Sequence, residues 1–313
     1  SNRLPQALAS LEAFVTNNSD NLGALISLGQ MYQKNGESEK AKKTYEKILT
    51  LSPNSIVALN NLAWLYSEEE KDPDKAYELA QQARNQHPDN GAVADTLGWI
   101  LHKRGDDRRS LALLREAATK IPDNGEIQFQ IHFHLGMVSY AMGEVDEART
   151  AFEKALATET PFPELAQAKA HLAWIGGGKR SLEDLEALRL ERPKDPVILM
   201  ALGQLYEEGG QFQDAIVACQ QALGANPQLL TALIKLGELY AGPMEDLVKA
   251  REFAEKARAV APNDLKVASI LGMIEYALGD FERAYVLLWQ SARNSSLGPE
   301  GLYKFATVAY SLG

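Results

Sequence analysis

The sequence of 313 residues contains one cysteine and fewer basic than acidic side chains. Cys219 alone cannot form an internal disulfide or build a cysteine-rich zinc site. A single cysteine is compatible with both an oxidising and a reducing compartment. The 32 Lys and Arg residues face 42 Asp and Glu residues, which gives a net charge of -10. A nucleic-acid-binding surface needs clustered cations to neutralise phosphates, so we expect no nucleic-acid partner.

Long apolar runs and strand patterns are also missing. No apolar run approaches the roughly 18 residues that cross a bilayer, so we expect no direct membrane insertion. Residues 1–5 lack the basic and then apolar pattern of a signal peptide. No segment alternates apolar and polar side chains as a half-buried strand does, which favours an all-helical fold.

Motifs for catalysis, metals and cofactors are weak. Residues 176–181 superficially resemble a phosphate-binding loop, but the first glycine of that motif would fall on Ala173 and the segment follows a helical pattern. The five histidines form no H-E-x-x-H motif, and no nucleophile lies beside a visible base. We therefore expect a protein that is not an enzyme and that needs no metal or cofactor.

What the sequence has in abundance is a repeat of about 34 residues. Leu-Gly or Leu-Ala pairs recur at 28–29, 62–63, 97–98, 135–136, 172–173, 202–203, 236–237 and 271–272. A proline follows each of the first seven pairs, after an alanine-led amphipathic run such as residues 41–45. Such a period predicts a stack of similar helix-turn-helix units.

These residues resemble the tetratricopeptide repeat family. The first repeat carries the family pattern at Leu25, Leu28, Gly29, Tyr32, Ala41, Tyr45 and Pro53. The resemblance implies an all-α, right-handed superhelical solenoid of antiparallel helix pairs, with sixteen helices in eight repeats and one further helix at each end. The small residues are expected to let the paired helices approach closely, and Cys219 takes a packing position where we expect it to be buried.

The repeat pattern also predicts how helices begin and end. Glycines seven residues after the pairs are expected to take positive φ and to end the first helices, at Gly36, Gly105, Gly143, Gly210 and Gly279. Residues after the repeat prolines are expected to cap the next helix, namely Asn54, Asp89 or Asn90, Asp123 or Asn124, and Asn263 or Asp264. Asp195 with Pro196 adds a further predicted cap.

The boundaries follow from the spacing and give one solenoid over residues 1–313. It comprises a half repeat at 3–21, repeats at 22–55, 56–90, 91–124, 125–162, 163–195, 196–229, 230–264 and 265–298, and a half repeat at 299–313. Four extra residues in the fourth repeat are expected to lengthen its first helix by one turn. The fifth repeat is degenerate and four residues short, so irregular packing is expected there.

The two half repeats predict that the chain is an excised piece of a longer array. The final helix should then present an uncovered apolar face that permits self-association. The residues expected on that face are Leu302, Tyr303, Phe305, Val308 and Tyr310.

The family resemblance also implies a binding site, because first helices line the concave surface of such arrays. Carried onto this chain, the groove positions are Asn60, Trp64, Asp95, Trp99, His102, Phe133, Met137, Tyr140 and Trp174. They imply a non-catalytic scaffold that holds a protein or peptide partner. The competing interpretation is that the large aromatic residues simply fill a tightly curled solenoid. His134 and His171, on adjacent first helices, are expected to be polar groove or surface residues.

Residues 60–66 and 95–99 are similar to bacterial envelope-associated tetratricopeptide proteins, some of them from exopolysaccharide or PEP-CTERM export systems. This similarity favours the periplasm or envelope over the cytoplasm. It also raises an alternative function, as a regulatory or substrate-recruiting region of a larger enzyme or polysaccharide-export assembly. A third hypothesis is direct glycan binding on the aromatic side chains.

Overall fold

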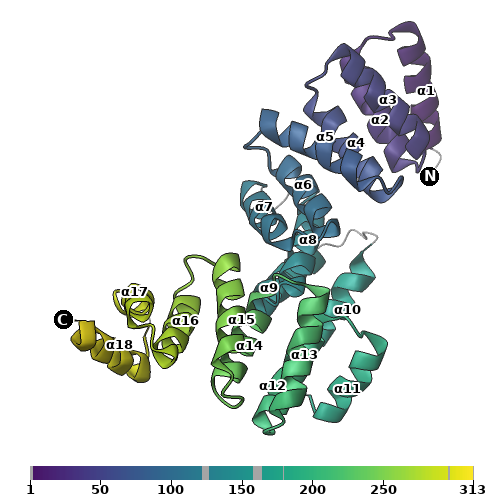
Figure 1. The fold of residues 1–313 in the computed structure, drawn as a ribbon. Coiled ribbons are helices and arrows are strands. Elements are labelled where there is room, and N and C mark those ends of the chain that lie inside the picture. Colours follow the sequence, from purple (N-terminus) through teal and green to yellow (C-terminus); the bar gives the residue numbers. More distant parts are fainter. Residues whose placement is uncertain (1–2, 122–126, 158–163, 179, 295–296, 313) are drawn as a thin grey trace. The chain divides into compact units, whose positions relative to one another are not determined.

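The computed structural model describes residues 3–121, 127–157, 164–178, 180–294 and 297–312, and these residues form eighteen α-helices and no strand (Figure 1). The expected all-helical class is confirmed. The first nine helices are α1 Arg3–Asn17, α2 Leu22–Lys34, α3 Ser38–Leu51, α4 Ile56–Glu68, α5 Pro73–Gln86, α6 Gly91–Lys103, α7 Asp107–Lys120, α8 Gln128–Ala141 and α9 Val145–Leu156. The others are α10 Leu165–Gly176, α11 Leu182–Glu191, α12 Pro196–Glu208, α13 Phe212–Ala225, α14 Leu230–Ala241, α15 Leu247–Val260, α16 Leu265–Leu278, α17 Phe281–Ala292 and α18 Pro299–Leu312.

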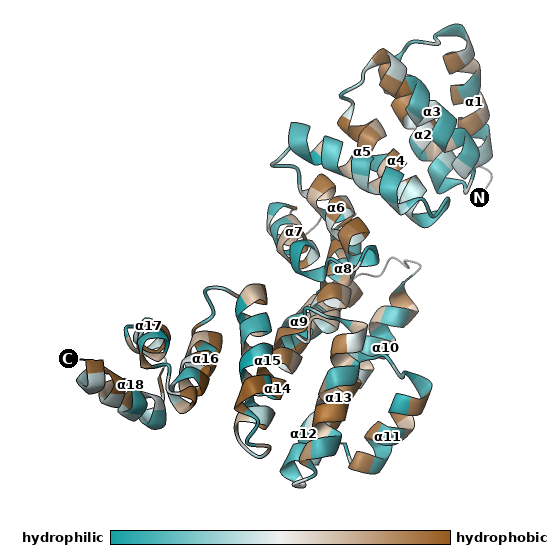
Figure 2. Ribbon diagram, in the orientation of Figure 1, coloured by the Kyte–Doolittle hydropathy of each residue, from teal (hydrophilic) through white to brown (hydrophobic). Residues whose placement is uncertain are grey.

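Apolar and polar residues are mixed along the helices (Figure 2). Helices pair closely because a small residue on one faces a large side chain on its partner. A Cβ atom at Gly29 of α2 would lie only 2.6 Å from Cε1 of Tyr45 on α3. Gly136 of α8 faces Phe152 of α9 at 2.7 Å in the same way. The predicted role of these glycines in close helix approach is confirmed.

The turn inside most helix pairs depends on a left-handed residue. Positive φ is found at all five glycines predicted to adopt it, Gly36, Gly105, Gly143, Gly210 and Gly279. Lys71 and Glu245 take the same conformation, with φ of 54° and 51°, in the turns that precede α5 and α15. These two turns lack a glycine at that position, so a side chain is held in the left-handed region that glycine occupies most easily.

Helix starts follow the predicted caps with one exception. Asn90 accepts a hydrogen bond from Val93 N, and Asp264 accepts one from Val267 N. The side chain of Asp195 caps α12, which begins at Pro196. The prediction of Asn54 as a cap is wrong, because Ser55 holds that position and makes no side-chain capping bond. Asn54 instead accepts a hydrogen bond from Gln86, and the predicted cap at Asp123 or Asn124 lies outside the described residues.

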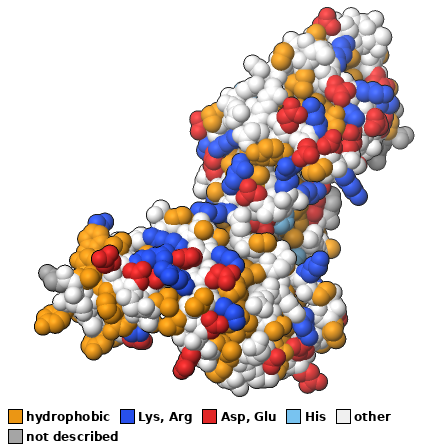
Figure 3. All heavy atoms as spheres, viewed as in Figure 1, with side chains coloured by type: hydrophobic (Ala, Val, Ile, Leu, Met, Phe, Trp, Pro, Cys, Tyr) orange, Lys and Arg blue, Asp and Glu red, His pale blue; other side chains and the backbone are white. Residues whose placement is uncertain are grey.

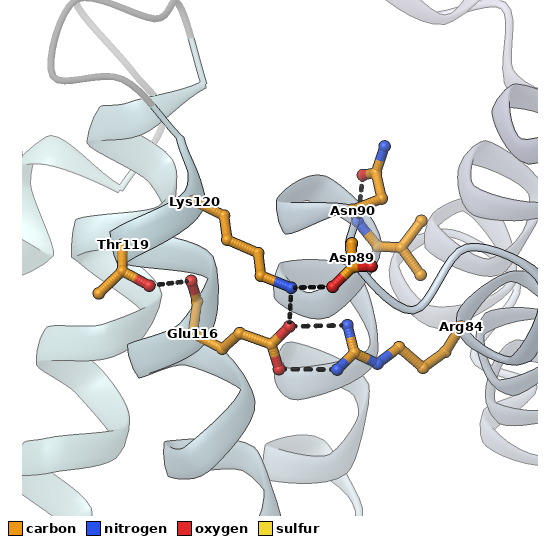
Figure 4. A network of polar contacts seen from close by, with 7 residues as sticks. Arg84, Asp89, Asn90, Glu116, Thr119 and Lys120 are labelled. Carbon is orange, nitrogen blue, oxygen red and sulfur yellow. Dashed lines mark hydrogen bonds and ion pairs between the residues drawn. The ribbon is translucent and has the colours of Figure 1, made fainter.

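A polar network ties α5 to α7 across the start of α6 (Figure 4). Both terminal nitrogens of Arg84 donate to Glu116, at 3.0 and 2.7 Å. Lys120 lies 2.7 Å from Glu116 and 3.0 Å from Asp89. Figure 4 shows Asn90, which caps α6, beside these charges. The network therefore joins α5 and α7, the second helices of two successive pairs, beside the start of α6.

The chain divides into two compact units. Unit 1 comprises residues 1–138 and 148–172, and unit 2 comprises residues 139–147 and 173–313. The division falls in the fourth and fifth repeats, where the repeat spacing departs from 34 residues. The expected extra turn of α8 is wrong, since α8 has 14 residues whereas α6 has 13. The additional residues of the fourth repeat therefore lie before Gln128.

Unit 2 contains a contact between segments that are distant in the sequence. The turn between α8 and α9, within residues 139–147, lies against the turn between α13 and α14. Asn226 Nδ2 donates to the carbonyl oxygen of Ala141 at 3.0 Å. A Cβ atom at Gly143 would lie 3.2 Å from Thr231 Oγ1. This turn is thus in contact with residues two and three repeats further along the chain.

Candidate partner-binding groove

A hollow of about 220 Å³ lies on the first helices of unit 1. We call it the amide groove, because side-chain amides dominate its polar lining. Its residues are Gln33, Asn60, Asn61, Trp64, Ala92, Asp95, Thr96, Ile127 and Gln130. They come from α2, α4 and α6 and from the start of α8. The groove thus brings together Asn60, Trp64 and Asp95 of the predicted site.

A buried tyrosine orients two amides of the groove by hydrogen bonds from the interior of the helix pair. Tyr45 is completely buried, and its Oη donates to Gln33 Oε1 at 3.1 Å. Asn61 Nδ2 donates to the same hydroxyl at 3.0 Å. Burial raises the pKa of Tyr45 to about 12, so the hydroxyl remains a donor at neutral pH. The core of the helix pair therefore fixes the directions of both amide groups.

The neighbouring amide of Asn60 has no such support. Its Oδ1 is shielded from water and has no hydrogen-bond partner among the described residues. Leaving a buried acceptor unsatisfied costs about 1–3 kcal/mol, and most buried polar groups avoid that cost. An unsatisfied acceptor that lines a hollow is therefore a candidate contact for a ligand that brings a donor.

Asp95 supplies the groove with a carboxylate. Its Oδ1 lies 2.8 Å from Nδ1 of His134, and both residues are buried. A carboxylate can only accept, so His134 Nδ1 carries the hydrogen of this bond. The His134 ring stacks on Trp99, with 4.2 Å between the ring centroids. The carboxylate is thus held in place by an imidazole that is itself clamped by an aromatic ring.

Trp99 has a second histidine beside it. The ring of His102 lies 5.1 Å from that of Trp99, and His102 Nδ1 lies 2.5 Å from Asp107 Oδ1. Trp99 and His102 are half-buried, and neither lines the amide groove. The structure therefore places them in the layer that supports Asp95.

Three of the predicted aromatic positions are buried. Phe133, Tyr140 and Trp174 are only 1%, 4% and 9% exposed, and Met137 is half-buried. In unit 1, Phe133 packs against Phe152, with 6.4 Å between the ring centroids. Phe133 therefore fills the interior, as the competing interpretation of the aromatic residues holds.

The other two buried aromatics belong to unit 2. Tyr140 Oη lies 2.9 Å from both carboxylate oxygens of Asp195, and burial together with that charge raises the pKa of Tyr140. The guanidinium of Arg180 lies 3.8 Å from the centroid of the Trp174 ring. Trp174 and Arg180 line a separate pocket of about 250 Å³ with Leu185 and other apolar residues. The fifth repeat therefore has its own hollow, separate from the amide groove.

Several residues of the groove were not predicted. Gln33, Asn61, Thr96 and Gln130 line it, and buried His134 orients Asp95 from behind. The available signal was the recurrence of amide side chains on successive first helices. Because the prediction gave weight to aromatic residues, it missed the polar character of the surface.

His171 is half-buried and stacks on Phe152, with 5.5 Å between the ring centroids.

The C-terminal helix exposes a narrower apolar face than expected. Tyr303 and Tyr310 are 70% and 90% exposed, and Leu302 is also exposed. The prediction is wrong for Val308, which is buried, and Phe305 is half-buried and stacks on Tyr285. Self-association through this helix stays a prediction.

Other features concern metals, membranes and the thiol. Within the described ranges, no group of three or more His, Cys, Asp or Glu side chains could hold a metal ion. None of the described helices combines the length and apolar character that spanning a membrane requires.

Cys219 is buried, as predicted, and burial raises its pKa to about 12. Figure 3 shows Lys and Arg side chains next to Asp and Glu over the face that it displays.

Comparison with known proteins gives several curated relatives. A peroxisomal targeting signal receptor of Pichia angusta is 29% identical over 170 residues, which are 49% of this chain and 28% of the receptor. The protein CTR9 homolog of Arabidopsis thaliana is 24% identical over 272 residues, 83% of this chain and 25% of that protein. The interferon-induced protein with tetratricopeptide repeats 3 of Mus musculus is 27% identical over 248 residues, 71% of this chain and 59% of that protein. The chain spans about a quarter of the length of the first two.

Solved structures share less sequence identity with this chain than the curated relatives do. TTC0263, a thermophilic protein of Thermus thermophilus, is 20% identical with a TM-score of 0.44, covering 55% of this chain and 90% of that one. The P58(IPK) TPR domain is 12% identical with a TM-score of 0.41, covering 99% and 94%. At these values the likeness carries no information about function.

Family comparison identifies the repeats directly. Models described as tetratricopeptide repeat match residues 22–55, 44–78, 129–159 and 176–229. The matched segments contain the helix pairs in which a small residue of one helix faces a large side chain of the other. The matched segments of this chain are therefore tetratricopeptide repeats.

Proposed function

We propose that this chain is a non-catalytic scaffold that holds an extended segment of a protein partner in the amide groove. The observation that carries the proposal is that Asn60 lines the hollow while its buried Oδ1 has no hydrogen-bond partner among the described residues. An extended peptide backbone offers an N–H donor at nearly every residue. Binding would therefore satisfy an acceptor that the free protein leaves unsatisfied.

The remaining lining supports the same function. Gln33 and Asn61 are oriented by Tyr45, so little side-chain entropy is lost when they contact a ligand. Amide groups both donate and accept, which suits a peptide backbone whose N–H and C=O groups alternate in direction. Trp64 is half-buried and lines the groove, where its ring can bury an apolar side chain of the partner.

The names of the relatives support a role in binding, but they do not identify the partner of this chain. The peroxisomal targeting signal receptors are, by their name, receptors for a signal. Since the chain spans about a quarter of their length, the activity of the whole receptor does not transfer to it.

A further part of the proposal is that the scaffold serves a bacterial envelope system, such as a polysaccharide-export assembly. It rests on the local similarity of residues 60–66 and 95–99 to proteins of such systems. Fractionation of cells that express the native gene tests this part separately, and recovery only in the cytoplasm would contradict it.

The test of the scaffold function is a selection from a random peptide library on the immobilised chain. A selected peptide is then labelled, and its affinity is measured by fluorescence anisotropy. Asn60→Ala should weaken binding roughly five- to tenfold, because one hydrogen bond contributes about 1 kcal/mol. Asn85→Ala is the matched control, since Asn85 is an exposed asparagine on α5 of the same unit. Equal affinities for the wild type and Asn60→Ala would contradict the proposal.

A further inference from the structure

We propose that the amide groove selects partner segments that carry a basic side chain, arginine or lysine, and that the Asp95 carboxylate is its receptor. This inference rests on the proposed function and names the chemistry of the bound segment. It follows from the charge of Asp95, from the unsatisfied acceptor of Asn60 and from the aromatic ring of Trp64 beside them.

Among the described residues that line the groove, Asp95 is the only charged one, and none is Lys or Arg. The basic side chains of α6 are already paired. Lys103 lies 2.6 Å from Glu68, and His102 is bound to Asp107. A carboxylate that has left bulk water without a cation is costly unless it is well hydrogen-bonded. A basic side chain from a partner would supply the missing charge.

The distribution of acceptors points the same way. Asp95 Oδ1 already accepts from His134, and Asn60 Oδ1 accepts from none of the described residues. A guanidinium carries five N–H donors and no acceptor, and an ammonium carries three donors. An acidic side chain would bring only further acceptors and a repelling charge. The groove is therefore complementary to a basic side chain and unfavourable to an acidic one.

Trp64 adds a third element. It lies four residues after Asn60 on α4, so both side chains project from the same face of the helix. A guanidinium or ammonium that approaches Asp95 within this hollow can lie over the indole ring. Such a cation–π contact contributes about 0.5–2 kcal/mol, depending on desolvation.

His134 gives the carboxylate its direction. The imidazole is buried between Asp95 and Trp99, so it cannot turn away without breaking both the hydrogen bond and the ring stacking. A fixed carboxylate loses little freedom on binding and can discriminate between donors by their position. We assign His134 a positioning role in the recognition of the basic side chain.

The experiment starts from the peptides selected on the immobilised wild-type chain. The selected sequences should be enriched in Arg or Lys at one position. For the tightest peptide, that residue is replaced by citrulline, which keeps the length of arginine and removes its charge. The anisotropy measurement should show at least about a tenfold loss of affinity, the size expected for removing one partner of a desolvated charge pair.

The matching protein variant is Asp95→Asn, which keeps an acceptor at the same place. It should bind the basic and the citrulline peptides with equal affinity. Asp89→Asn is the control, because Asp89 is exposed and lies outside the groove, and it should keep the discrimination. The citrulline comparison uses the wild-type chain, so it decides the question even if Asp95→Asn does not fold.

The outcomes separate the two proposals. If peptides are selected without enrichment in Arg or Lys, the charge recognition is wrong and the scaffold function stands. The same holds if citrulline binds as tightly as arginine, or if a folded Asp95→Asn variant keeps the discrimination. If no peptide is selected, both proposals fall.

Discussion

Tyr45→Phe tests the link between the core of a helix pair and the groove above it. The phenylalanine ring keeps the packing against Gly29, so the substitution removes only the hydroxyl. That hydroxyl makes two hydrogen bonds, to Gln33 and Asn61, and each bond contributes about 0.5–1.5 kcal/mol. Both amides are half-buried and can partly turn to water, so we expect the lower end of the combined range. The free energy of unfolding should fall by about 1 kcal/mol in urea titrations, without a change in the slope.

The same variant should also bind a selected peptide more weakly, by a few-fold. The reason is that Gln33 and Asn61 must then be ordered when the ligand binds, which costs about 0.5–1.5 kcal/mol for each side chain. Tyr66→Phe is the matched control, because Tyr66 Oη lies 3.5 Å from Glu46 and contributes little. A Tyr45→Phe protein with unchanged stability and unchanged affinity would refute the reasoning.

The pH dependence gives an independent check on Tyr45. Its pKa is raised from 10.0 to about 12 by burial, so the unfolded chain loses this proton first. The folded state then binds more protons than the unfolded state, and the contribution of Tyr45 to stability falls as the pH rises from 10 toward 12. The decline of stability over this range should be smaller in Tyr45→Phe, where the other tyrosines with a raised pKa still contribute to it. An identical decline in both proteins over this range would show that the tyrosine is not buried in solution.

Four other predictions follow from the structure. Trp64→Ala should weaken peptide binding by about 2 kcal/mol, the scale of a hot spot, while circular dichroism stays unchanged; loss of thermal stability without loss of affinity would favour a packing role. Arg84→Ala should lower the unfolding free energy by about 0.5–1 kcal/mol through loss of the two bonds to Glu116, and added salt should reduce the difference. Cys219 should react with a disulfide reagent at least about tenfold more slowly than a free thiol at pH 8, because it is buried and burial raises its pKa from 9.0 to about 12; rapid labelling of the folded chain would contradict its burial. Tyr310→Ser should reduce concentration-dependent association in sedimentation velocity, and association that is equal in both proteins would exclude this residue from the contact.

The helix pairs could be predicted because the repeat fixes both small residues and turns at set distances. Gly29 and Gly136 must be small where a ring of the partner helix approaches, and Gly36 must adopt positive φ. The cap at Asn54 was missed by one residue. Neighbouring polar residues compete for a cap, and the sequence alone does not decide which of them takes it.

The groove could be predicted only where the repeat spacing is regular. Asn60, Trp64 and Asp95 lie in repeats that keep the spacing of the family, and they line one hollow. Phe133 and Tyr140 follow an insertion of four residues, which was expected inside the first helix of the repeat and lies before α8 instead. Their side chains pack into the interior, where Phe133 meets Phe152 and Tyr140 reaches Asp195. The role of His134 depends on a contact with a residue 39 positions away, which periodicity does not show.

The contact between Asn226 and Ala141 affects the order in which unit 2 can be completed during synthesis. The two residues are separated by 85 positions, whereas an array of repeats usually needs only neighbouring contacts. A ribosome that adds about 5–20 residues per second needs roughly 4–17 seconds to make that stretch. Until then the turn at residues 139–147 lacks its partner surface. A premature stop in the sixth repeat would leave this turn uncovered, although every helix before it had been made.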